Sequence, residues 1–311
     1  MTSHYRVRNW SAYNAALETR GSLTLWIDEA VLSAWKNTQK TGQRGASNTY
    51  SDLAIETLLS LKSVYRLPLR QTLGLARSVF ELRSIELDLP HYSTLSRRAR
   101  GLNIELSVTP SAEARHVVID STGVKVYGEG EWKARQHGVS KRRTWLKLHI
   151  GVDEATGEIL AAVVTPNSTH DGEVLPELLD EVDDEIDQVS GDGAYDQSHC
   201  YDAIDERGAK AAIPPRKDAK VWFHGNRKGP AHPRDENLRH IRKVGRSAWK
   251  QEVNYHRRSL SETAMYRLKT MFTGEVCARK IETQTTELKI ECKLLNRMTQ
   301  LAMPDSYRVE A

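Results

Sequence analysis

The spacing of apolar side chains predicts three helices in the first third of the chain. Their expected limits are residues 50–65, 69–83 and 93–101. Leu58 and Leu61 in the first of them recur at helical spacing. Pro68 suits the first turn of the second helix, and Pro90 interrupts the chain before the third. We therefore expect a small all-helical domain over residues 50–110.

The segment before these helices is polar. Residues 36–49 contain two glycines and almost no apolar side chains, which is typical of a loop or linker. We expect residues 1–49 to form an N-terminal arm and polar linker. The starting sequence MTSHYRVRNW lacks the apolar stretch of a signal peptide, and no apolar run is long enough to cross a bilayer. These features predict a soluble cytoplasmic protein without a membrane partner.

From about residue 115 the pattern changes to strands. Residues 116–120 form an apolar run that ends in an acid, and residues 144–153 and 158–166 read as a hairpin around the turn EATG. The later elements are a helix within 171–185, a strand leading into GDGAYD, a helix over 197–207, a strand at 211–213 and a long helix over 252–272. This order predicts an α/β fold with one mixed sheet flanked by helices over residues 111–311, interrupted by a basic irregular insertion at about 214–247.

Charge is unevenly distributed along the chain. The net charge is +4, but residues 1–110 carry +5, residues 111–213 carry −11 and residues 214–311 carry +10. Basic ends around an acidic middle are expected if the ends bind nucleic acid and the middle gathers cations. Ordinary solvated faces are the alternative. The three cysteines show no CxxC spacing, which argues against a zinc site and a disulfide framework.

Three segments are candidates for DNA contact. The third predicted helix is short, basic and rich in Ser and Thr, which suits the recognition helix of a helix-turn-helix, although a helical cap domain with a basic face is the alternative. Residues 132–147 hold six Lys or Arg and no acid, and residues 214–246 hold ten against three acids, both with aromatic residues interleaved. The predicted contacts are Ser93, Thr94, Arg97 and Arg98 in the helix, Arg142 and Arg143 in the second segment, and Arg216 and Lys217 in the third.

Three acids stand out for their local setting. Asp120 ends the first strand, and Asp192 lies between two glycines, which permit a sharp turn and a close approach of ligand. Either acid could simply occupy a turn. At about 100° per residue, Tyr255, Arg258, Glu262 and Lys269 fall within an arc of roughly 60°, opposite the apolar face of the last predicted helix. A surface ion pair between Arg258 and Glu262 is the alternative there.

Together these acids suit a metal site. Clustered carboxylates repel one another, so a cluster of three would be costly without cations. Hard oxygen ligands suit Mg²⁺ or Mn²⁺. Two such ions about 3.5–4 Å apart can activate a water or a 3′-hydroxyl and stabilise the leaving oxygen of a phosphodiester. No small-molecule cofactor is indicated.

The same residues carry a family resemblance. VVIDSTG and VSGDGAYD resemble the first and second Asp blocks of bacterial insertion-sequence transposases of the DDE type, in the group named after insertion sequence five. IPPRKDA (213–219) resembles the segment that follows the second block, and Tyr255, Arg258, Glu262 and Lys269 match the signature Y-x₂-R-x₃-E-x₆-K. The resemblance covers about residues 48 to 304.

The resemblance implies a ribonuclease H-like fold in which Asp120, Asp192 and Glu262 are the catalytic metal ligands. It implies nicking at terminal inverted repeats, followed by attack of the freed 3′-hydroxyl on target DNA. Tyr255, Arg257, Arg258 and Lys269 are then the expected DNA contacts near the site. Pairing of two transposon ends implies at least a homodimer on DNA. A non-catalytic repressor of the inverted repeats and a nuclease without strand transfer are the alternatives.

Overall fold

The computed structural model describes residues 4–38, 48–126, 145–223 and 231–309 of the chain. These residues form two compact units. Unit 1 comprises residues 1–107 together with residues 278–311, and unit 2 comprises residues 108–277. None of the described helices is long and apolar enough to cross a membrane.

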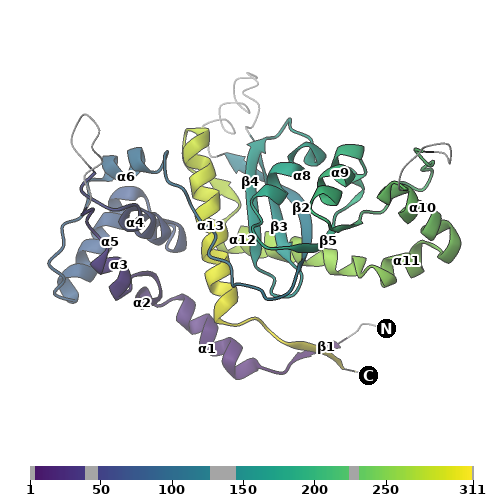
Figure 1. The fold of residues 1–311 in the computed structure, drawn as a ribbon. Helices are drawn as coiled ribbons and strands as arrows, with labels where there is room; N and C mark the ends of the chain where they lie inside the picture. Colours follow the sequence, from purple (N-terminus) through teal and green to yellow (C-terminus); the bar gives the residue numbers. More distant parts are fainter. Residues whose placement is uncertain (1–3, 39–47, 127–144, 224–230, 310–311) are drawn as a thin grey trace, which may run out of the picture. The chain divides into compact units, whose positions relative to one another are not determined.

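Unit 2 is built around a mixed sheet, which has six strands in the described part of the chain (Figure 1). They are β2 (Arg115–Val126), β3 (Trp145–Asp153), β4 (Ile159–Pro166), β5 (Ile186–Ser190), β6 (Lys210–Ala212) and β7 (Glu275–Val276). The order is β4-β3-β2-β5-β6, with β7 pairing with one end of β2. β2, β3 and β4 are antiparallel neighbours, whereas β5 and β6 continue the sheet in parallel. The predicted mixed α/β fold with a β3–β4 hairpin is confirmed.

Helices cover both faces of this sheet. The helices of unit 2 are α8 (Asp171–Asp180), α9 (Ser198–Glu206), α10 (Pro233–Val244), α11 (Arg246–Glu252) and α12 (Ser259–Phe272), with 3-10 turns η1 (Gly193–Tyr195) and η2 (Tyr255–Arg258). On one face, the apolar stripe of α8 packs against Val117 and Ile119 of β2 in a buried cluster. Side chains alternate along a strand, so Val118 and Asp120 point to the opposite face. There β2 and β3 contact α12.

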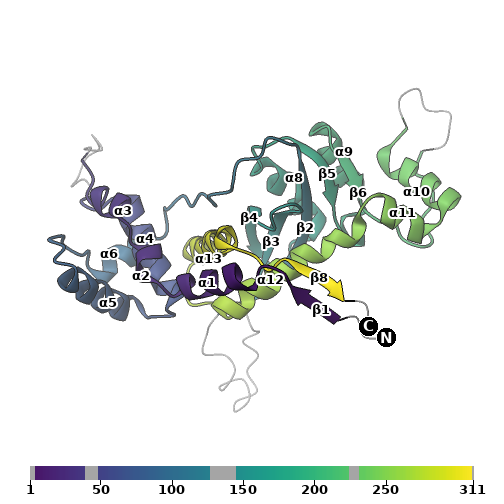
Figure 2. The same ribbon diagram turned by 90° about the horizontal axis from the view of Figure 1, so that it is seen from below.

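Unit 1 is mainly helical (Figure 2). Its elements are β1 (His4–Val7), α1 (Trp10–Arg20), α2 (Leu23–Trp26), α3 (Glu29–Ser33), α4 (Asp52–Val64), α5 (Leu69–Leu82), α6 (Tyr92–Arg98), α13 (Ile281–Leu301) and β8 (Ser306–Val309). α4, α5 and α6 confirm the three helices predicted from the apolar spacing. α13 packs against α4 and buries side chains around most of its surface.

The division into units differs from the predicted domains in two ways. The region expected to be an arm and linker contains three short helices, and its Trp26 and Trp35 are buried. Part of the predicted linker, residues 39–47, lies outside the described residues. The C-terminal residues 278–311 belong with unit 1, because α13 supplies the core that α4 packs against.

Two predictions about the last third of the chain were wrong. The insertion at 214–247 was expected to be irregular, but it contains α10, which starts with Pro233 and carries acids in its first turn and bases in its last, as the helix dipole favours. The long helix expected over 252–272 is broken. Asn254 has a left-handed backbone with φ of 52°, and a 3-10 turn separates α11 from α12.

Candidate active site

Asp120 and Asp192 are brought together by the parallel pairing of β2 and β5. Val118 of β2 is paired with Ser190 of β5, and each acid lies two residues further along its chain. Because the strands run in the same direction, Asp120 within β2 lies beside Asp192, which follows the end of β5. The prediction that the strand ends at Asp120 was wrong, since β2 continues to Val126 through its pairing with β3.

The turn after β5 fixes Asp192. Its Oδ1 accepts a hydrogen bond of 2.8 Å from the Ala194 amide and so caps η1. A Cβ on Gly191 would lie 3.0 Å from both Ile119 Cγ1 and Tyr195 Cδ2, so a larger residue would displace the turn from β2. The close approach that this glycine permits is therefore to the protein's own core.

Arg258 connects the first acid to the third. Its Nη1 donates to Asp120 Oδ2 at 3.1 Å, and its Nη2 forms an ion pair with Glu262 on the first turn of α12. The ion pair between Arg258 and Glu262, which the sequence left as an alternative, is thus present. It is not a simple surface pair, because the same guanidinium reaches a residue 138 positions away on the central strand.

The three carboxylates influence one another electrostatically. The pKa of Asp120 is raised, first by burial and further by the charges of Asp192 and Glu262. A 2.8 Å hydrogen bond from the Ser121 amide and the charge of Arg258 both oppose this rise. The site therefore carries excess negative charge, which an additional cation would offset.

The donor set suits a divalent cation, although the acids do not yet converge on one point. Among the described residues, no group of three or more His, Cys, Asp or Glu side chains is placed to hold a metal ion. The Arg258 guanidinium occupies oxygens of Asp120 and Glu262 instead. Carboxylate oxygens are the ligands that Mg²⁺ and Mn²⁺ prefer. A cation bound by these two acids would compete with Arg258 for them.

Tyr255 and Lys269 were predicted to share one helix face with Arg258 and Glu262, but they lie on two different elements. Tyr255 lies on η2 rather than on the α-helix, so a uniform 100° rotation does not apply to it. Burial raises its pKa, its side chain bonds to Arg258, and Lys250 Nζ lies 4.7 Å from its ring centroid. Lys269 is exposed on α12, about two turns beyond Glu262.

Tyr195 is a buried residue after the second acid that the sequence analysis did not single out. Its side chain is buried, and its hydroxyl has no hydrogen-bond partner among the described residues. Burial raises its pKa, and the charges of Asp171, Asp120 and Asp192 raise it further. The only sequence signal was an aromatic residue three positions after the second acid.

The next acid, Asp196, joins the insertion to the segment that follows β5 within unit 2. It accepts hydrogen bonds from Arg234 of α10, at 2.6 Å from Nε and 3.2 Å from Nη2. The Arg234 guanidinium lies 3.8 Å from the Trp222 ring centroid, and the Asp235 carboxylate accepts bonds from the Trp222 and Phe223 amides. The insertion is therefore held by Asp196, which lies four residues after Asp192.

The remaining predicted DNA contacts differ in their surroundings. Arg257 is paired with Glu154, while Arg216 and Lys217 are exposed after β6. Arg142 and Arg143 lie outside the described residues. Of the described side chains, Arg257, Arg216 and Lys217 have no ion pair with the three acids.

On α6, the predicted DNA contacts Arg97 and Arg98 form hydrogen bonds or ion pairs with other residues of unit 1. Arg98 donates to the Tyr50 carbonyl at 2.9 Å and pairs with Asp52, so its guanidinium supports the start of α4. Arg97 bonds locally to Ser93 and Thr94 and is exposed. The helix is capped by His91, whose side chain accepts a hydrogen bond from the Ser93 amide.

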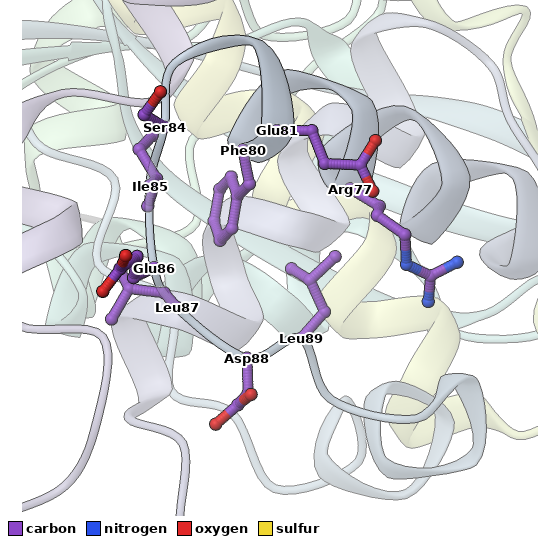
Figure 3. Close-up of a pocket in the computed structure, with 9 residues that line it drawn as sticks. All are labelled: Arg77, Phe80, Glu81, Ser84, Ile85, Glu86, Leu87, Asp88 and Leu89. Atoms are coloured by element: carbon purple, nitrogen blue, oxygen red, sulfur yellow. The ribbon is translucent and has the colours of Figure 1, made fainter.

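A cavity of about 500 Å³ lies elsewhere, in unit 1 (Figure 3). It is lined by the last turns of α5 and by residues 84–89, which curve around Phe80. Asp88 in its wall is paired with Lys36, and the Trp35 indole donates to the Asp88 carbonyl. None of the three candidate acids, Asp120, Asp192 and Glu262, lines this cavity.

Comparison with known families identifies the family of the chain. A family described as Transposase DDE domain matches residues 111–297, which is more than half of the chain, and a second family of the same description matches residues 18–129. No solved structure matches the chain. The first match spans the whole sheet and all three acids. The chain therefore belongs to the DDE transposases of insertion sequences, a family of metal-dependent enzymes that cleave and join DNA.

Proposed function

We propose that this chain binds the terminal inverted repeats of its insertion sequence, cleaves the donor strand by hydrolysis and joins the freed 3′-hydroxyl to target DNA. Asp120, Asp192 and Glu262 are the proposed catalytic ligands of two Mg²⁺ or Mn²⁺ ions. The observation that supports this most strongly is that Asp120 and Asp192 lie beside each other on β2 and after β5, and that Arg258 joins Asp120 to Glu262 of α12.

The chemistry of the ions is to activate water or a 3′-hydroxyl and to stabilise the leaving oxygen when they are bound. The chain's own residues then position the ligands and the DNA. The Ala194 amide holds one oxygen of Asp192, and the Ser121 amide holds one oxygen of Asp120. Arg258 can exchange its carboxylate partners for a phosphate, for which a guanidinium is equally suited.

The wider DNA contacts follow from the charged surfaces. Lys269 lies on the same helix as Glu262 and is free to approach a phosphate. We assign Tyr255, Arg257, Arg216 and Lys217 to the DNA around the acids, α6 to the inverted repeats, and Arg142 and Arg143 to the same substrate. Joining two ends requires at least two copies of the chain on DNA, and the expected location is the bacterial cytoplasm.

The decisive test uses purified protein, Mg²⁺ and a donor DNA that carries its own inverted repeats. Wild-type protein is expected to release 3′-hydroxyl ends and join them to a target plasmid. Asp192→Asn and Glu262→Gln are expected to bind the donor DNA normally and to lower both steps by at least about 10³-fold, because each substitution removes a proposed metal ligand. Asp187→Asn, an exposed acid on β5 paired with Lys210, is the matched control and is expected to keep activity.

The alternatives give different results in the same assay. A repressor would bind the repeats without cutting them. A nuclease would release ends without joining them. Full activity of both Asp192→Asn and Glu262→Gln would refute the proposed catalytic roles.

A further inference from the structure

The two ends of the described chain pair with each other in unit 1. β1 and β8 form a two-stranded antiparallel sheet, which we call the terminal ribbon (Figure 2). Each strand contains the sequence Tyr-Arg-Val, and the register places Tyr5 opposite Arg308 and Arg6 opposite Tyr307. Opposed residues share a face of the sheet. Each face of the terminal ribbon therefore presents one tyrosine and one arginine.

The base of the terminal ribbon is fixed by hydrogen bonds. The Arg8 amide donates to the Asp305 carbonyl at 2.8 Å. The Asn9 side chain makes two further bonds to the residues just before β8: it donates to the Met303 carbonyl and accepts from the Asp305 amide. Arg20 of α1 donates to the Met298 and Ala302 carbonyls at the end of α13. The ribbon is thus joined to both neighbouring helices.

The arginines of the terminal ribbon are available to a ligand. Arg6, Arg8 and Arg308 are exposed, and none of the three has a carboxylate partner within the described residues. The Arg8 guanidinium lies 5.0 Å from the Tyr307 ring centroid. Arg8 therefore lies on the same face of the ribbon as Arg6 and Tyr307, just beyond the end of β1. Tyr5 is 66% exposed and Trp10, at the start of α1, is 59% exposed. An exposed surface of this kind is rich in groups that bind phosphate and stack on sugars or bases.

Duplex DNA fits this surface better than a second copy of the chain. A two-stranded antiparallel ribbon has the size of the major groove, and arginines at its sides can reach the phosphates. The strand edges are also open to pairing with another strand. A symmetric pair of ribbons would bring arginine-rich strands together, and like charges across strands are destabilising. Charge complementarity therefore favours DNA.

We propose that the terminal ribbon is a DNA-binding element of unit 1, separate from α6 and from the acids of unit 2, in which Arg6, Arg8 and Arg308 contact phosphates. It assigns a role to the Tyr-Arg-Val sequence that occurs in both β1 and β8 and is paired in register. Only the identity of the DNA, a transposon end, depends on the proposed function. Binding itself does not require catalysis.

The test measures binding of the full chain to a labelled duplex without divalent metal, by fluorescence anisotropy between about 50 and 200 mM salt. Each lost phosphate contact is expected to reduce the slope of log K against log salt by about 0.9. The triple variant Arg6→Ala, Arg8→Ala, Arg308→Ala should reduce the slope by about 2–3 and weaken binding at least about tenfold at low salt. Replacing the same three residues with lysine should restore most of the slope.

A matched control removes the same charge elsewhere in unit 1. Arg83→Ala, Arg279→Ala, Lys280→Ala alters three exposed bases outside the ribbon and should leave the slope within about 0.5 of wild type. An unchanged slope in the ribbon variant, or an equal fall in the control, would overturn the proposal. So would a ribbon variant that becomes monomeric at unchanged DNA affinity, because the surface would then join copies of the chain. Asp192→Asn, in contrast, should keep the wild-type slope while losing cleavage, so the two proposals fail separately.

Discussion

Two arginines in unit 2 each pair with two carboxylates, and they differ in how deeply the guanidinium is buried. Arg115 is 3% exposed, donates at 2.8 Å to both Asp184 and Asp153, and gives a third bond to the Thr109 carbonyl. Asp153 is only 2% exposed and also accepts from Thr156. The Arg115 guanidinium therefore has three partners within unit 2, although Asp184 itself is 38% exposed.

The Arg258 bridge is open in comparison. Its acids, Asp120 and Glu262, are 20% and 55% exposed, and a further acid, Asp192, adds to the negative charge felt by Asp120. One guanidinium therefore serves an acid cluster that it cannot neutralise. The difference between the two bridges supports a structural role for Arg115 and fits the proposal that the acids around Arg258 bind a cation.

The largest difference in stability is expected on breaking the closed bridge. Arg115→Met leaves Asp153 buried without its cation, which should cost about 3–5 kcal/mol of unfolding free energy. Urea denaturation followed by circular dichroism measures the loss. Lys210→Met, which breaks the exposed pair with Asp187, is the control and should cost less than about 1 kcal/mol. Equal losses in the two variants would remove the distinction between a framework bridge and an exposed pair.

Breaking the open bridge should affect metal binding more than folding. Arg258→Met removes a cation that competes for Asp120 and Glu262, so Mn²⁺ affinity without DNA should rise roughly tenfold, measured by electron paramagnetic resonance. Unfolding free energy should change by less than about 1 kcal/mol. Arg257→Met, which breaks the neighbouring pair with Glu154, should leave Mn²⁺ affinity unchanged. Weaker Mn²⁺ binding by Arg258→Met would show that the guanidinium assists the metal instead.

The smallest change in stability is expected from neutralising Asp120, the acid on the central strand. The folded-state pKa of Asp120 is raised, so its ionised form disfavours folding, and Asp120→Asn should raise Tm at pH 7 by about 1–3 °C while abolishing cleavage. The gain should shrink as pH falls and vanish below about pH 4, where the wild-type carboxyl is protonated in both the folded and unfolded states. Thermal scans between pH 7 and pH 3 measure it, with Asp187→Asn as control. A lower Tm for Asp120→Asn at pH 7 would contradict the excess of negative charge.

The sheet could be predicted from sequence because its signals are local. The alternation in β3 and β4, the turn between them and the apolar spacing of α8 all lie within short windows. Helix α13 was not predicted, since its buried residues include Gln284, Thr286 and Asn296, which blur the apolar period. The four-residue strands β1 and β8 were missed because they are stabilised by pairing across the whole chain.

The acids of the site were visible in sequence, but their arrangement was not. The setting of Asp120, Asp192 and Glu262 beside small or basic residues marked them as candidates. The contact between Arg258 and Asp120 spans 138 positions, so no local pattern reports it. The break at Asn254 was missed because a left-handed backbone at a non-glycine residue has a weak sequence signal. Tyr195 shows the same limit, since its burial in the core of unit 2 depends on packing against distant residues.

The most direct test of the catalytic site locates the bound metal on the protein itself. Fe²⁺ replaces Mg²⁺, and ascorbate and peroxide then generate hydroxyl radicals that cut the backbone close to the bound ion. Mass spectrometry is predicted to find cuts around Asp120, Asp192 and Glu262, which excess Mg²⁺ suppresses and Asp192→Asn reduces. Cuts confined to other segments, or cuts at these three acids that neither Mg²⁺ nor Asp192→Asn diminishes, would contradict the assignment of the metal-dependent site.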